Sequence, residues 1–177
     1  MSQNNFNGPA LAAHSVLTQA ANHLQSSLLL LVRLYWGWQF AQTGWGKLHS
    51  LPRVAHFFAS LGIPAPGLTA HLIAGLEFFG GLLLIIGLAS RFTGLLLAGN
   101  MFVAYLAADR QALLSVFSDP GKFYNADPYT FLFASVLVFV FGPGRFAIDA
   151  ILAYRQRRDT AVSAAPNFGA SSGAPAV

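Results

Sequence analysis

The sequence predicts an all-α protein, an integral membrane four-helix bundle with a short interfacial helix between its first and second membrane spans. Of its 177 residues, 55% are hydrophobic and only 9% are charged, whereas a soluble domain has about 25% charged residues. The mean hydropathy is +0.54. Apolar residues therefore exceed what one core of this size can bury, and we expect lipid to cover much of the surface. This composition argues against a soluble enzyme.

Four apolar stretches have the length of about 20 residues that a helix needs to cross a hydrocarbon layer of about 30 Å. They begin near Ser27, Thr69, Phe92 and Tyr129. Residues 1–25 precede them as a polar, Ala-rich N-terminal arm. This arm has no Lys or Arg, so it does not resemble a signal peptide. We expect the membrane domain to span residues 26–152.

The connections differ in length and in character. Residues 87–91 are so few that the second and third spans must form an antiparallel hairpin. Between the first two spans, apolar residues recur at helical spacing before a Gly-Ile-Pro stop, which predicts the short interfacial helix. We expect the charged segment from Asp109 to Asp127 to be a solvated loop. Residues 153–177 begin with basic residues and become rich in Ala, Ser, Gly and Pro, which predicts a disordered tail.

The basic residues near the span ends predict the orientation. With four spans, both termini lie on the same side, and the Arg-Gln-Arg-Arg sequence at 155–158 favours the cytoplasm for that side. The same side collects Arg91 and Arg145, and the opposite side collects Lys47, Arg53, Arg110 and Lys122. We therefore expect a multi-pass protein of the bacterial inner (plasma) membrane with both termini cytoplasmic.

Polar side chains inside the spans are the candidate site. A charge in the membrane interior costs about 2.5–3.5 kcal/mol on insertion scales. If each span begins at a membrane surface, helical rise places Arg33, Glu77 and Asn100 roughly 10, 18 and 14 Å above the cytoplasmic face, a difference that a long arginine side chain can span. We therefore predict an ion pair between Arg33 and Glu77, with Asn100 alongside.

Two interpretations of these three residues stay open. A buried, satisfied pair can simply fix the register of the helices. Alternatively, Arg33, Glu77 and Asn100, with Trp36 nearby, could hydrogen-bond a quinone carbonyl or relay a proton. The sequence does not decide between a structural and a functional role.

Small residues follow the same helix faces as the charged ones. The series Arg33, Gly37, Phe40, Gly44 and Lys47 advances by four or three residues at each step. Glycines in such a series let membrane helices approach each other closely. The predicted packing glycines are Gly37, Gly44, Gly81 and Gly87.

Other kinds of site are disfavoured. The chain has no cysteine, which excludes disulfides, thiolate metal sites and iron–sulfur ligation. The histidines have no ligand spacing with carboxylates, so we predict no metal site. The basic residues are scattered and no nucleic-acid motif accompanies them, so nucleic acid is not an expected partner.

Three motifs resemble the DoxX family over about residues 28–151. The resemblance implies a small four-span bacterial inner-membrane protein, similar to the small membrane subunit of thiosulfate:quinone oxidoreductase. The resemblance supplies no catalytic residues, so whether the chain is itself an enzyme or a non-catalytic subunit of a quinone-linked oxidoreductase stays open. The motifs are Arg33-x3-Gly37-x2-Phe40-x3-Gly44-x2-Lys47, then Phe57-x3-Leu61-Gly62-Ile63-Pro64-x-Pro66, then Glu77-x2-Gly80-Gly81-x5-Gly87-x3-Arg91.

Three functions are consistent with these observations. The first is a redox-associated membrane subunit that docks an oxidoreductase and contacts quinone. The second is a small transporter or lipid-binding membrane protein, and the third is a purely structural anchor. No bound cofactor is evident from the residues, quinone is the candidate, and the expected partners are the lipid bilayer, an oxidoreductase subunit and a second copy of the chain.

Overall fold

The chain is all-helical in a computed structural model that describes the backbone of residues 7–163 and the side chains of residues 14–21 and 23–160. Within these residues there is no strand, which confirms the all-α prediction. The helices of this part of the chain are α1 (Asn7–Leu48), α2 (Leu51–Ser60), α3 (Pro66–Ile86), α4 (Ser90–Ala107), α5 (Arg110–Leu114), α6 (Pro120–Tyr124), α7 (Pro128–Phe141) and α8 (Ile148–Ser163).

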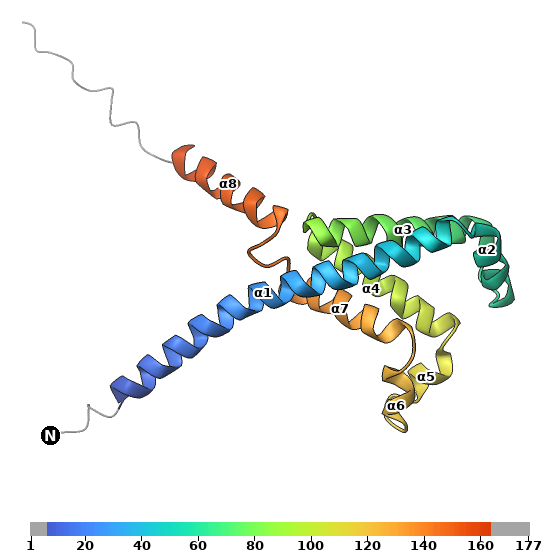
Figure 1. The fold of residues 1–177 in the computed structure, drawn as a ribbon, viewed down its shortest axis with the longest axis horizontal. Coiled ribbons are helices and arrows are strands. Elements are labelled where there is room, and N and C mark those ends of the chain that lie inside the picture. The colour runs from blue at the N-terminus through green and yellow to red at the C-terminus, as the bar shows by residue number, and fades with distance from the viewer. Residues whose placement is uncertain (1–6, 164–177) are drawn as a thin grey trace, which may run out of the picture.

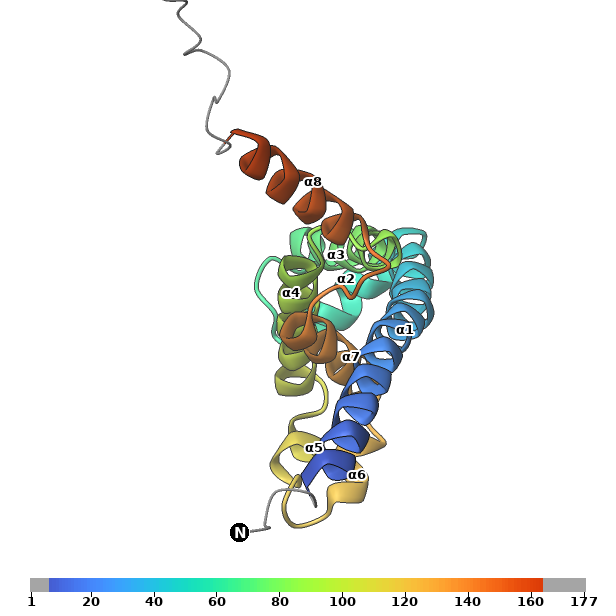
Figure 2. The same ribbon diagram turned by 90° about the vertical axis from the view of Figure 1, so that its left-hand side faces the viewer.

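Four helices pack around one apolar core. The contacts run from α1 to α3, from α3 to α4, from α4 to α7 and from α7 back to α1 (Figures 1 and 2). The core lies between them and includes Phe40, which is fully buried and meets Phe131 edge to face at 4.7 Å. Its other buried members are Val32, Leu84, Leu97, Met101, Ala134 and Val138.

Glycines set the close packing of α1 on α3. A β-carbon on Gly44 would overlap the backbone of Phe78, and one on Gly81 would lie 2.5 Å from the backbone nitrogen of Ala41. Side chains at these positions would push the two helices apart. The same contacts fix the register, because they place Gly44 beside Phe78 and Gly37 beside Gly81.

The hairpin between α3 and α4 is as short as predicted. Helix α3 ends at Ile86, and Gly87 follows with φ = 71°, a left-handed conformation that favours glycine at a helix end. Helix α4 begins at Ser90. The predicted helix between the first two spans is also present as α2, which packs against α3. Its position at a membrane interface stays a prediction.

The segment from Asp109 to Asp127 is not the plain loop that we expected. It contains α5 and α6, and α6 begins at Pro120, directly after Asp119. A proline is favoured in the first turn of a helix, so the Asp-Pro-Gly sequence that indicates a turn also starts this helix. The hydroxyl of Tyr105 donates to the carbonyl of Phe123 at 2.7 Å and ties α6 to α4.

The two ends of the described chain are helical. Residues 7–25 of the predicted arm belong to α1, and residues 153–163 of the predicted disordered tail belong to α8. The Arg-Gln-Arg-Arg sequence is made of good helix formers, which is the physical reason for this difference. Residues 1–6 and 164–177 lie outside the described residues.

One helix of the described chain, α3, is long and apolar enough to cross a membrane by length and composition, and α7 is a shorter apolar helix. The prediction of four spans is therefore supported at α3 and stays a prediction for the rest.

Candidate functional site

The centre of the candidate site is the carboxylate of Glu77, midway along α3. Its side chain is only 2% exposed. The amine of Lys47 donates to both carboxylate oxygens, at 2.5 and 2.6 Å. The side-chain amide of Asn100 donates to Oε1 at 3.1 Å. A buried carboxylate is costly unless it is paired and hydrogen-bonded, and here it is both.

The packing of α1 on α3 explains why Lys47 reaches Glu77. Lys47 lies in the last turn of α1, one turn beyond Gly44, whose backbone touches that of Phe78. The amine therefore arrives at the level of Glu77. The side chain of Lys47 is 33% exposed, so the site has a polar connection from the buried carboxylate to the surface.

Asn100 is placed by the antiparallel packing of α4 on α3. Gly80 lies against the side chain of Leu97, and three residues further along α4 comes Asn100, opposite Glu77. Its side chain is half-buried. We refer to Lys47, Glu77 and Asn100 together as the polar cluster.

The predicted ion pair between Arg33 and Glu77 is wrong. Arg33 lies near the carboxyl end of α3, where its Nε donates to the carbonyl of Leu84 at 2.9 Å. Leu84 is seven residues from Glu77, which corresponds to about 10 Å along a helix. The estimated depths already differ by about 8 Å, and the prediction failed because the side chain of Arg33 bonds carbonyls at its own end of the bundle, while Lys47 takes the carboxylate.

Arg33 instead closes one end of the bundle. Its guanidinium is buried, and it donates to the carbonyls of Leu84, Ile85, Pro143 and Phe146. The first two carbonyls belong to the last turn of α3, where a cation also interacts favourably with the helix dipole. The other two belong to the segment between α7 and α8. Arg33 thus joins α1, α3 and that segment.

Asp149 completes this end from the other side. Its two carboxylate oxygens accept from the backbone nitrogens of Ala89 and Ser90, each at 2.8 Å. A carboxylate at a helix N-terminus satisfies amides that have no partner within the helix. Arg33 and Asp149 therefore hold the two halves of the α3–α4 hairpin, and sequence reasoning did not identify Asp149.

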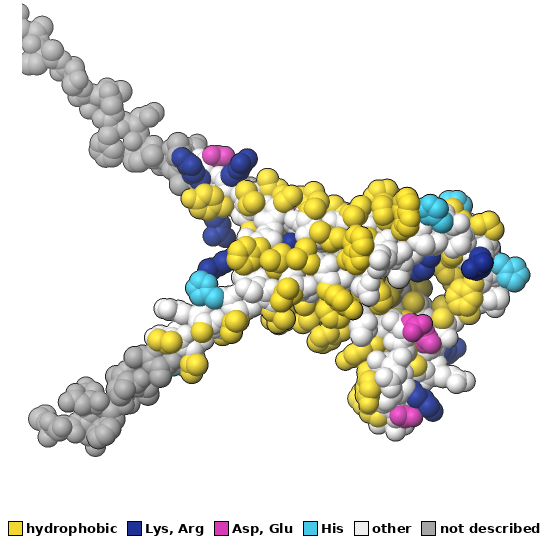
Figure 3. Space-filling model, viewed as in Figure 1, with side chains coloured by type: hydrophobic (Ala, Val, Ile, Leu, Met, Phe, Trp, Pro, Cys, Tyr) yellow, Lys and Arg dark blue, Asp and Glu magenta, His cyan; other side chains and the backbone are white. Residues whose placement is uncertain are grey.

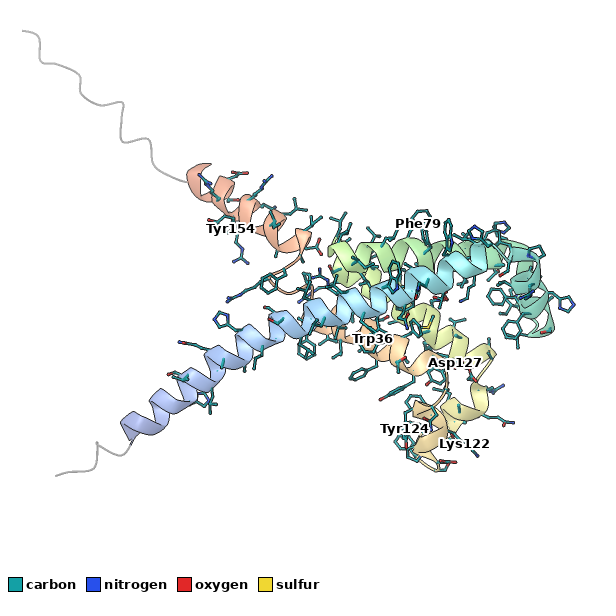
Figure 4. The ribbon with its side chains drawn as sticks, in the orientation of Figure 1. Trp36, Phe79, Lys122, Tyr124, Asp127 and Tyr154 are labelled. Atoms are coloured by element: carbon teal, nitrogen blue, oxygen red, sulfur yellow. The ribbon has the colours of Figure 1, made fainter. Side chains whose placement is uncertain are left out.

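Trp36 does not belong to the polar cluster. It packs against the apolar core and lies beside α7 in Figure 4. Trp45, two residues before Lys47, and Phe78, directly after Glu77, form an aromatic pair with ring centroids 5.4 Å apart.

The signal for Lys47 was present in the sequence. Lys47 and Arg33 stand on the same face of α1 at opposite ends of one series, so either could have met Glu77. Only the glycine contacts between α1 and α3 decide which one does. No group of three or more His, Cys, Asp or Glu residues that could hold a metal occurs among the described residues.

The fold and the site define a class of protein, a helical bundle with a buried acid–base pair between two closely packed helices. Residues 28–110 match the DoxX family model. The resemblance to DoxX is therefore confirmed for this part of the chain, from α1 to the start of α5, which includes the whole polar cluster.

Two known proteins are similar to the chain. The protein named "Putative oxidoreductase CatD" from Bacillus subtilis (strain 168) is 34% identical over 83 residues, which is 47% of this chain and 60% of CatD. "Inner membrane protein YqjF" from Escherichia coli (strain K12) is 27% identical over 125 residues, which is 70% of this chain and 91% of YqjF. The match thus spans 60% of the length of CatD. No solved structure matches the chain.

Proposed function

We propose that the chain is a DoxX-type protein of the bacterial inner membrane that serves as the membrane subunit of an oxidoreductase. In this proposal the polar cluster contacts the head group of a quinone. The observation that carries the proposal is the buried carboxylate of Glu77 on α3, which accepts hydrogen bonds from Lys47 on α1 and Asn100 on α4.

Two observations support the membrane location. YqjF is named as an inner membrane protein. Only 33% of the apolar window of α3 is buried, and apolar side chains cover much of the bundle surface in Figure 3. Water does not stabilise such a surface, whereas lipid does. The oxidoreductase association is supported by the name of CatD.

The cluster has the chemistry that quinone reduction requires of a protein site. A quinone that becomes a quinol takes up two electrons and two protons. In this proposal the electrons come from the oxidoreductase partner. The amine of Lys47 donates one proton to the quinone oxygen that it contacts and regains a proton from water, the second quinone oxygen takes its proton from water, and Glu77 stabilises the charged form of the amine throughout. Because the side chain of Lys47 is one-third exposed, its amine can take up protons from water.

Aromatic residues beside the cluster suit a flat ligand. Trp45 is half exposed and faces Phe78. A quinone ring that stacks on Trp45 would lie on the exposed side of Lys47, where the carbonyl oxygen could accept from the amine. We therefore expect the head group beside Trp45 near the end of α1, rather than at Trp36.

A mass spectrum of the intact protein, purified from its native membrane in mild detergent, tests the proposal. We expect a co-purifying oxidoreductase subunit, a retained quinone, or both. A protein that carries neither would overturn the redox function and leave a transporter or a structural anchor. Uptake of solute into proteoliposomes would then identify a transporter.

A pair of variants tests the site itself. Glu77→Gln keeps the size of the side chain but removes its charge, so quinone retention should fall. Asp119→Asn makes the same chemical change at an exposed carboxylate directly before α6 and should leave retention unchanged. Equal retention in Glu77→Gln and in the unaltered protein would contradict the assignment of the cluster.

A further inference from the structure

Helix α1 is longer than the bundle that it joins. Its 42 residues correspond to about 63 Å, about twice the hydrocarbon thickness of a membrane. Among the side chains that the structure describes on α1, the first buried one is Ser26, which packs near Gly144. All side chains described between residues 14 and 25 are exposed. Figure 1 shows this part of α1 projecting away from the other helices.

Apolar residues form one line along the projecting part and continue onto the bundle. Leu17, Leu24 and Leu31 are spaced seven residues apart, and Ala21 and Leu28 lie between them, four residues after Leu17 and Leu24. At 100° per residue, all five lie within about 40° of one direction on the helix. All five are exposed, with 70% exposure at Leu17 and 69% at Leu24. We call these residues the leucine stripe.

We propose that the leucine stripe pairs with the leucine stripe of a second copy of this chain, as a parallel two-helix coiled coil. A repeat of seven residues with leucine at every repeat is the pattern by which two helices pack side by side. Small residues such as Ala21 between the leucines allow the helices to approach closely.

The membrane decides the direction of pairing, and here the inference rests on the proposed function. All copies insert with the same orientation, so a two-fold axis along the membrane normal brings identical segments of α1 together in parallel. The stripe then meets itself in register along its whole length, both within the lipid and beyond it.

Neither lipid nor a charged partner fits the stripe as well as a second copy. Lipid can cover Leu28 and Leu31, but the length of α1 carries Leu17 out of the hydrocarbon, where water makes its exposure unfavourable. The sequence from residue 7 to residue 32 contains no Lys, Arg, Asp or Glu. This segment therefore has no charged side chain that would attract a charged surface or repel an identical helix.

Disulfide cross-linking tests the pairing in the full-length protein, because the chain has no cysteine of its own. The variants Leu17→Cys and Leu24→Cys are expressed in membranes and treated with a mild oxidant. The control is Gln19→Cys, which is also exposed but lies about 200° around the helix from Leu17. We expect a disulfide-linked dimer in both stripe variants, at a yield at least several-fold above the control.

Equal yields in the stripe variants and the control would overturn the inference, as would cross-links only to another protein. The mass of the unaltered protein in lipid nanodiscs gives an independent result, since a dimer is expected and a monomer would overturn the pairing. A different result would overturn the proposed function. A chain absent from the membrane fraction would overturn that function, whereas a monomer within the membrane fraction would overturn only the dimer.

Discussion

Replacing Lys47 with methionine should destabilise the protein strongly, because it leaves the buried carboxylate of Glu77 without its charged partner. The change removes both hydrogen bonds from the amine to the carboxylate of Glu77, at 2.5 and 2.6 Å, and leaves only the amide of Asn100 at 3.1 Å. The carboxylate is 2% exposed and cannot gain water in exchange. Removing one partner of a buried ion pair lowers the free energy of unfolding by about 3–5 kcal/mol.

Removing the charge of Glu77 instead of that of Lys47 should lower the free energy of unfolding by less. Glu77→Gln leaves Lys47 without its carboxylate, but the 33% exposed side chain can reach water, and the new amide still offers Asn100 an acceptor. We expect a loss of about 1.5–3 kcal/mol, the range for a lost hydrogen bond to a charged group. The double variant removes both charges and should be about as stable as Glu77→Gln alone.

Equilibrium unfolding in detergent, followed by tryptophan fluorescence, measures these free energies. Lys122→Met is the matched control, because Lys122 is 69% exposed and its distance to Asp119 is 3.6 Å, a pair worth less than about 1 kcal/mol. If the double variant Lys47→Met/Glu77→Gln is as unstable as Lys47→Met alone, the unpaired carboxylate of Glu77 is not the cause of the destabilisation. The same conclusion would follow from a Lys47→Met variant that matches the Lys122→Met control.

Three further predictions concern the frame around the site. Gly44→Ala should destabilise the bundle by more than about 1 kcal/mol, since the added β-carbon would overlap the backbone of Phe78. Gly46→Ala has open space around it and should be neutral or stabilising by about 1 kcal/mol. Thermal unfolding in detergent compares the two variants. Asp149→Ala should cost about 1 kcal/mol through the lost helix cap, and Asp149→Asn should cost less because it keeps an acceptor; equal stability of the alanine variant and the unaltered protein would contradict the capping role. Tyr105→Phe removes the hydrogen bond to Phe123 at a cost of about 1 kcal/mol, and amide hydrogen exchange should become faster in α6; unchanged exchange there would show that the bond does not hold this helix.

The sequence was sufficient to predict features that depend on local pattern. The hairpin before Ser90 follows from a connection too short for anything else, and α2 follows from apolar spacing and a proline stop. The series of residues from Arg33 to Lys47 correctly indicated which face of α1 packs closely on another helix.

The axial register between those faces could not be predicted. The sequence shows Arg33 and Lys47 on one face of α1, but the partner of Glu77 depends on how far α1 slides along α3. That sliding is fixed by backbone contacts at Gly37, Gly44 and Gly81, whose partners are distant in sequence. The role of Asp149 could not be predicted for a similar reason, since it accepts hydrogen bonds from backbone amides about sixty residues earlier in the chain.

The four acceptors of Arg33 also have a consequence for the order in which the chain assembles. Two of them, Leu84 and Ile85, leave the ribosome about fifty residues after the arginine, but Phe146 follows only after 113 residues. A fragment that ends at residue 110, where the family match ends, gives this guanidinium only half of its acceptors. We therefore expect Arg33 to gain its full set of hydrogen bonds only when the residues between α7 and α8 have been synthesised.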